Sequence, residues 1–298
     1  MKNNRRFFFE LRNYMLIFTF FSLWVSTYFK EETENILAYI LILSLGILHG
    51  TNDIKLIRKE SSDKNRGTSK KILYFYLLFI ITGILFFYYI PSMALLIFIL
   101  FSAFHFGEQH WISRLTKKSI AIKFIYIAYG ITILGLLFLN NNLEVSEVIN
   151  NIAGTYISKD VYVYATIFSF LVLVIISIRL IANKIIKVNI WEELFYLLLF
   201  YIIFQTASLL WAFAIYFIFW HSIPSLADQV YFLYGNYKKE NFIKYLKSSF
   251  LHWIISIVGL AMLFLIFGNQ DRLFLSIFFT SIAAITFPHV WIMAKLNK

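Results

Sequence analysis

The sequence predicts an all-α, polytopic integral membrane protein: a single membrane domain over residues 1–298, built as a bundle of about ten transmembrane helices. Three observations support this fold class. The chain is 60% hydrophobic and 20% aromatic but only 14% charged, a composition typical of membrane proteins. Apolar runs long enough to cross a bilayer recur along the chain, and the basic residues gather in alternate connections between them.

The apolar segments follow one another with mostly short polar connections, and most approach the roughly 20 residues that a membrane helix needs. We expect helices at residues 14–30, 36–50, 71–90, 92–112, 120–140, 161–182, 190–205, 208–228, 249–268 and 272–294. The longest connections are predicted at 51–71 and 141–160. The basic start of the chain resembles a signal peptide, but no small-residue cleavage site follows it, so the first helix is expected to be retained.

The positive charge predicts how the helices cross the membrane. Of the 27 Lys and Arg residues, 24 fall in the N-terminal tail, the C-terminal tail or the connections 51–71, 113–123, 179–193 and 229–248. Basic connections stay on the cytoplasmic side, which predicts a multi-pass protein of the cell's inner (cytoplasmic) membrane with both termini in the cytoplasm. The net charge of +11 is therefore a topology signal, and no nucleic-acid partner is expected.

Four of the six histidines lie inside predicted membrane helices, namely His49, His105, His221 and His289. The first three lie about 13 residues from the outer ends of their helices and the fourth about 17, so at 1.5 Å per residue we expect them near one plane. A lone histidine in a membrane helix often serves helix packing. Because polar groups are costly in lipid, intramembrane ionisable residues are also commonly functional. From spacing alone, packing and metal binding both remain open.

Two carboxylates accompany these histidines. Asp53 follows His49 by four residues and Glu108 follows His105 by three, which places each pair on one face of a continuous helix. A carboxylate in that position can orient a metal-ligating imidazole from outside the coordination sphere, and Asp53 is expected to act on His49. The alternative is that both carboxylates cap or solvate helix ends at the interface.

The absence of cysteine restricts the chemistry of any metal site. With no Cys in the chain, disulfides, thiolate ligands and cysteine nucleophiles are excluded, so a metal must bind His, Asp or Glu. An imidazole set suits Fe(II), Zn or Cu, and iron with four ligands would keep open positions for dioxygen or substrate. The many aromatic residues are more commonly explained by ordinary core and lipid-facing packing, but they could also line a tunnel for a long apolar polyene.

The segments GILHGTND, SAFHFGEQHW, FWHSIPS and FPHVW resemble the Brp/Blh family, the bacteriorhodopsin-related membrane β-carotene dioxygenases. The likeness extends over about residues 36–294, and its most specific element is HGxxD, with His49, Gly50 and Asp53, followed by HFG at His105. The resemblance implies Fe(2+)-dependent cleavage of β-carotene from the bilayer with O2 at the central 15,15' double bond. The two molecules of all-trans-retinal would serve a microbial rhodopsin.

The resemblance also implies iron ligands. His49, His105 and His221 match the family's proposed ligands, but some members carry another histidine one turn after the third, where this chain has Ser225. His289 is our candidate for the fourth ligand, with Ser225 or water as the alternatives.

Two other functions compete with this prediction. A non-enzymatic rhodopsin-assembly or haem-binding membrane protein would use histidines as axial ligands. A di-iron desaturase or hydroxylase would need about eight clustered histidines, and the six scattered ones here disfavour it. The sequence predicts neither the oligomeric state nor the roles of His110 and His252.

Overall fold

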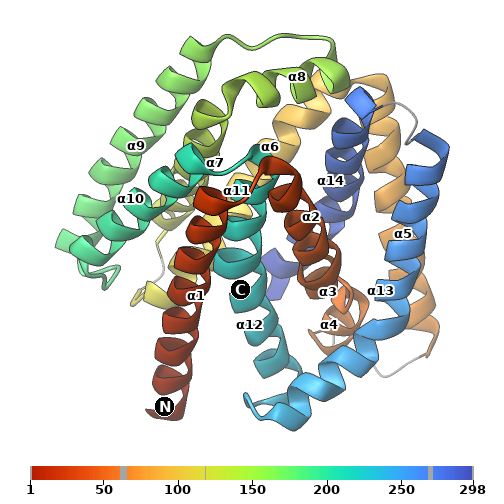
Figure 1. The fold of residues 1–298 in the computed structure, drawn as a ribbon. Coiled ribbons are helices and arrows are strands. Elements are labelled where there is room, and N and C mark those ends of the chain that lie inside the picture. Colours follow the sequence, from red (N-terminus) through yellow and green to blue (C-terminus); the bar gives the residue numbers. More distant parts are fainter. Residues whose placement is uncertain (1, 61–65, 118, 268–270, 297–298) are drawn as a thin grey trace. The chain divides into compact units, whose positions relative to one another are not determined.

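The structure, a computed structural model, describes residues 2–60, 66–117, 119–267 and 271–296. Within these ranges every regular element is a helix, apart from one isolated β-bridge between Leu115 and Ile186 (Figure 1). The all-α class is thus confirmed. The chain divides into two compact units, which are Met1–Leu41, Ile99–Glu147 and Tyr156–Pro224, and Ile42–Phe98, Val148–Thr155 and Ser225–Lys298. The single membrane domain expected from the sequence stays a prediction.

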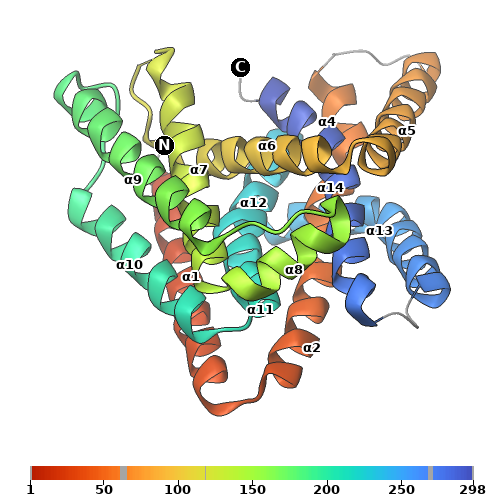
Figure 2. The same ribbon diagram turned by 90° about the horizontal axis from the view of Figure 1, so that it is seen from above.

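The first unit contains the N-terminal helices and the middle of the chain. Its elements are α1 (Lys2–Tyr28), α2 (Glu31–Leu41), the second part of α6 (Pro91–Trp111), the 3-10 helix η2 (Ile112–Arg114), α7 (Ala121–Asn140), the start of α8 (Asn142–Ala153), α9 (Lys159–Ala182), α10 (Ile190–Thr206), α11 (Leu209–Ile215) and the π-helix η3 (Tyr216–Ser222). Helix α7 packs on both α9 and α10, and α11 packs on α2 (Figure 2).

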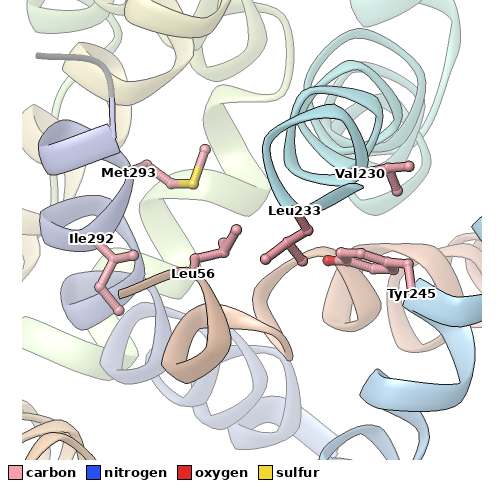
Figure 3. Close-up of a cluster of buried hydrophobic side chains, with 6 residues drawn as sticks. All are labelled: Leu56, Val230, Leu233, Tyr245, Ile292 and Met293. Atoms are coloured by element: carbon pink, nitrogen blue, oxygen red, sulfur yellow. The ribbon is translucent and has the colours of Figure 1, made fainter. Parts of the chain in front are cut away.

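The second unit contains helices from residues 42–98 and from the C-terminal part of the chain, together with the end of α8. Its elements are the π-helix η1 (Ile42–Gly46), α3 (Ile47–Gly50), α4 (Asp53–Glu60), α5 (Arg66–Tyr89), the first part of α6, the end of α8, most of α12 (Ile223–Tyr234), α13 (Lys239–Phe267) and α14 (Asp271–Leu296). Helix α14 packs on α4, α5 and α13. A buried cluster joins α4, α12, α13 and α14 through Leu56, Val230, Leu233, Tyr245, Ile292 and Met293 (Figure 3).

The helices lie where the sequence predicted membrane segments, but over the described ranges fewer than ten of them are long and apolar enough to cross a membrane. Each of the ten predicted ranges falls mostly on helical residues, and residue 268, the end of the range 249–268, lies outside the described residues. Among the described residues, seven helices are long and apolar enough to cross a membrane: Glu31–Lys59, Pro91–Arg114, Ala121–Asn140, Lys159–Ala182, Leu209–Tyr234, Lys239–Met262 and Ser276–Ala294. The segment Leu73–Tyr89 is a shorter apolar helix, and α10 has 17 residues. An all-helical membrane bundle is therefore supported, while the count of ten is not confirmed.

Glycines hold α6 and α7 in direct backbone contact. A Cβ atom added at Gly107 would overlap the backbone of Tyr126, and one added at Gly130 would overlap the backbone of Ala103. Small residues at such crossings allow the close packing that stabilises helix pairs in membranes. This contact fixes the part of α6 that carries His105.

The π-helix η3 interrupts the helix that carries His221, and the proline that follows gives a physical reason. Pro224 has no N–H to donate to the carbonyl of Trp220, and its ring crowds the preceding turn. The N–H of Ile223 bonds instead to the carbonyl of Ile218, five residues back. The wider turn places His221 in η3 with a side chain that is only 1% exposed. Such π-turns are frequent at functional sites.

Candidate metal centre

The first unit holds one pair of buried histidines, His105 on α6 and His221 on η3. Their ring centroids lie 4.6 Å apart at an interplanar angle of 75°. Phe106 lies 4.7 Å from the His221 ring, and Phe217 stacks on that ring at 5.7 Å and 17°. The two imidazoles are therefore placed side by side in an aromatic environment that excludes water.

The second unit holds the other pair, His49 on α3 and His289 on α14. Their ring centroids lie 4.8 Å apart at 87°, and the side chains are 5% and 4% exposed. Helix α14 continues through Pro288, directly before His289. The structure thus brings the four predicted histidines together two by two, and the expectation that all four lie in one plane stays a prediction.

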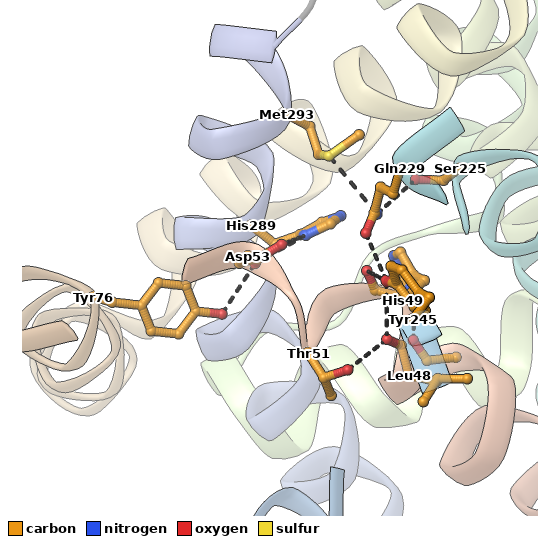
Figure 4. Close-up of polar contacts among 11 residues, drawn as sticks. Leu48, His49, Thr51, Asp53, Tyr76, Ser225, Gln229, Tyr245, His289 and Met293 are labelled. Atoms are coloured by element: carbon orange, nitrogen blue, oxygen red, sulfur yellow. Dashed lines mark hydrogen bonds and ion pairs between the residues drawn. The ribbon is translucent and has the colours of Figure 1, made fainter. Parts of the chain in front are cut away.

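Hydrogen bonds fix which nitrogen carries the proton in the second pair. Nδ1 of His49 bonds to the carbonyl of Gly46, and Nδ1 of His289 lies 2.9 and 3.1 Å from the two carboxylate oxygens of Asp53 (Figure 4). A carbonyl and an ionised carboxylate only accept, so both imidazoles donate through Nδ1. In the neutral imidazole this arrangement leaves the lone pair on Nε2, the tautomer in which outer partners hold metal-ligating histidines.

The observed partner of Asp53 differs from the one expected. The sequence placed His49 and Asp53 on one helical face, but α3 ends at Gly50 and α4 begins at Asp53, with a turn between them. The four-residue spacing therefore no longer keeps the two side chains on one face. Asp53, only 1% exposed, instead bonds His289.

A second group of polar contacts surrounds the His49 backbone. The Tyr245 hydroxyl lies 2.7 Å from Oε1 of Gln229 and 3.3 Å from the carbonyl of His49. The Gln229 amide in turn donates to Ser225 Oγ at 3.3 Å (Figure 4). The Ser225 hydroxyl, which was the alternative fourth ligand, therefore belongs to a hydrogen-bonded group with Gln229. Ser225 and Gln229 are four residues apart on α12, whereas the contact from Tyr245 to the His49 carbonyl joins residues far apart in the chain, which no local spacing could have indicated.

His110 has a different environment, which the sequence did not predict. Its Nε2 donates to the carboxylate of Glu193 at 2.7 Å, and Nδ1 accepts from the Tyr129 hydroxyl at 3.1 Å. The Tyr129 ring stacks on the imidazole at 4.2 Å, and Arg114 forms an ion pair with Glu193 at 2.9 Å. Both nitrogens of His110 are engaged, which argues against a metal-ligand role.

Glu108, a predicted outer partner of His105, is buried, whereas His252, to which the sequence assigned no role, is exposed. Glu108 is only 7% exposed, within electrostatic reach of Tyr126 on α7, which does not suit a carboxylate that solvates a helix end. Its role beside His105 stays a prediction. His252 is exposed on α13, and its carbonyl accepts from Ser256 at 3.0 Å.

The buried histidines offer the type of donor atom that iron, zinc and copper accept, and metal binding itself stays a prediction. The four buried side chains are imidazoles, which suit Fe, Zn and Cu, and Asp53 contacts Nδ1 of His289, across the ring from Nε2. Asp53 is thus placed as a partner of the imidazole and not as a further ligand. No group of three or more His, Asp or Glu side chains that could hold a metal ion is present in the part of the chain that the structure describes.

The fold and these histidines define a helical integral membrane protein with paired intramembrane imidazoles. Comparison with protein families matches residues 40–297 to the family described as Beta-carotene 15,15'-dioxygenase. The chain belongs to this family, whose substrate is β-carotene. No curated protein matches the chain, and no solved structure does.

Proposed function

We propose that the protein cleaves β-carotene at its central double bond with O2, using Fe(II) for which His49, His105, His221 and His289 supply the ligands. The family match over residues 40–297 carries this proposal. The two pairs of buried imidazoles support it, because they provide the nitrogen donors that a non-haem iron centre needs in a chain without cysteine.

The reaction balances without a further reductant. One β-carotene and one O2 give two molecules of retinal, so both oxygen atoms end in the two aldehydes. Iron, when bound, supplies the redox chemistry with dioxygen. The protein's own groups hold the ligands: Gly46 and Asp53 keep the Nδ1 protons of His49 and His289, and the aromatic rings around His221 keep water away.

The substrate dictates where the reaction takes place. β-Carotene dissolves in the bilayer and not in water, so we propose that it reaches the protein laterally from the lipid of the cytoplasmic membrane. The many exposed aromatic and aliphatic side chains of the membrane helices suit that environment. Retinal formed there would pass to a microbial rhodopsin in the same membrane.

The test is expression in a bacterium that accumulates β-carotene, followed by pigment analysis. The wild-type chain is expected to consume β-carotene and form retinal. Alanine at His105 or His221 is expected to abolish retinal formation while the protein still inserts, whereas His252→Ala, at an exposed histidine, keeps wild-type yield. Retinal formation by the His105 and His221 variants at the wild-type level would contradict the proposed ligands, and a wild-type chain that leaves β-carotene intact would contradict the activity.

A further inference from the structure

A three-residue chain of hydrogen bonds runs from α5 to α14 in the second unit. The Tyr76 hydroxyl donates to Oδ2 of Asp53 at 3.2 Å. Nδ1 of His289 donates to the same carboxylate and lies 2.9 Å from Oδ1 and 3.1 Å from Oδ2. Figure 4 shows the carboxylate between the phenol and the imidazole.

The Asp53 carboxylate needs both donors because it is buried. It is only 1% exposed, and a buried carboxylate without hydrogen-bond donors is strongly disfavoured. The imidazole supplies one donor and the phenol supplies the other. With Oδ2 held by Tyr76, rotation of the carboxylate about its Cβ–Cγ bond is restricted, and the carboxylate remains directed at His289.

From these contacts we propose that Tyr76 is a positioning residue for His289, acting through Asp53. This inference rests on the proposed function, because it assigns His289 to the metal. The Tyr76 hydroxyl fixes the carboxylate, the carboxylate fixes the ring and tautomer of His289, and Nε2 of that ring is kept directed for coordination. Outer partners of this kind change metal affinity when they are removed.

The neighbouring contacts favour this role over simple side-chain packing. His289 lies edge-on to His49, and Gly50 lies beside Nδ1 of His289, where a Cβ would reach 3.8 Å. The segment from α3 to α4 therefore brings the His49 ring and the Asp53 carboxylate to the same imidazole. A rotation of His289 would break its bond to Asp53 and also change its contact with His49.

The experiment measures Fe(II) affinity of the purified full-length protein in detergent, without oxygen, by competition with a chelator. Tyr76→Phe removes one hydroxyl and keeps the ring, and it is expected to weaken Fe(II) binding by about tenfold. Asp53→Ala is expected to weaken binding by about 10–100-fold. Tyr74→Phe is the matched control, because Tyr74 lies on the same helix with its side chain 64% exposed, and its affinity is expected to equal that of the wild type.

The double variant distinguishes positioning from general support of the fold. Because Tyr76 acts through Asp53, Tyr76→Phe is expected to cause no further loss of affinity in the Asp53→Ala background, a non-additivity that a double-mutant cycle reveals. Unfolding temperatures of the metal-free variants are measured alongside. Unchanged affinity in Tyr76→Phe, or losses that simply add, would overturn this inference alone. A wild-type protein that binds no Fe(II) would overturn the proposed iron centre together with it.

Discussion

At the scale of single residues, the hydrogen bonds of the two ring nitrogens distinguish a histidine that could bind a metal from one with a structural role. His49 and His289 donate through Nδ1 to Gly46 and Asp53, which leaves the lone pair on Nε2. His110 uses both nitrogens, on Glu193 and Tyr129. The sequence could place these histidines in helices, but the partners of His289 and His110 lie on other helices, so residue spacing alone could not separate a ligand from a structural imidazole.

The fourth ligand can be tested by one pair of variants. His289→Ala is expected to lose bound iron and retinal formation, because it removes a buried imidazole whose tautomer Asp53 fixes. Ser225→Ala is expected to keep most of both and to lose about 0.5–1.5 kcal/mol of stability with its hydrogen bond to Gln229. Iron content and retinal yield are measured on each purified variant. A His289→Ala protein with full iron content would remove His289 from the ligand set.

At the scale of the helices, apolar runs predicted where each helix lies, but their internal irregularities were not predicted. The segment around 208–228 reads as one helix in the sequence, whereas the structure divides it into α11, the π-helix η3 and α12. Pro224 explains the change of hydrogen bonding, yet proline in a membrane helix is also compatible with a simple kink. The connection 51–71 likewise contains α4, whose start at Asp53 redirects that side chain to His289.

The crossing of α6 and α7 gives a prediction at this scale. Gly107→Ala is expected to destabilise the protein by about 1–3 kcal/mol, the usual cost of overpacking, because the added methyl group overlaps the backbone of Tyr126. Gly259→Ala on α13 is the control, since a Cβ there has open space around it, and alanine favours a helix over glycine by roughly 1 kcal/mol. Unfolding in a denaturant series compares the two. Equal stability of both variants would show that α6 and α7 can separate without cost.

At the scale of the whole molecule, hydrogen bonds join pairs of connections that the charge pattern predicts on one side of the membrane. The N–H of Lys187 donates to the carbonyl of Arg114 at 3.0 Å, which joins two connections expected in the cytoplasm. Lys59 donates to the carbonyl of Leu233 at 2.8 Å, which joins two more. Connections that meet in this way lie on one side of a bilayer, and that this side is the cytoplasm stays a prediction of the charge pattern.

The predicted topology can be tested with reporter fusions. Fusions after residues 145, 186 and 240 are expected to report outside, inside and inside, because the last two lie in basic connections and the first in an acidic one. Reporters that are active only in the cytoplasm or only outside it measure this directly. The opposite side at any of the three positions would contradict the number of helices between them, and with it the common depth predicted for the histidines.

The sequence was enough to predict which residues belong to the candidate site, but not which of them contact one another. The motifs around His49, His105, His221 and His289 identify the buried imidazoles and the family. The pairing of His105 with His221 and of His49 with His289 depends on helix packing between segments far apart in the chain, and no spacing rule reaches that far. The binding of a single iron by all four stays a prediction of the sequence.

The most direct measurement is retinal formation by the purified protein as a function of added Fe(II). Metal-free protein supplied with β-carotene and O2 is expected to form no retinal, and activity is expected to rise with Fe(II) until the site is saturated, with two retinals for each β-carotene consumed. Activity that persists unchanged in protein stripped of metal, or that does not return with Fe(II), would contradict the histidine-bound iron on which the proposed function depends.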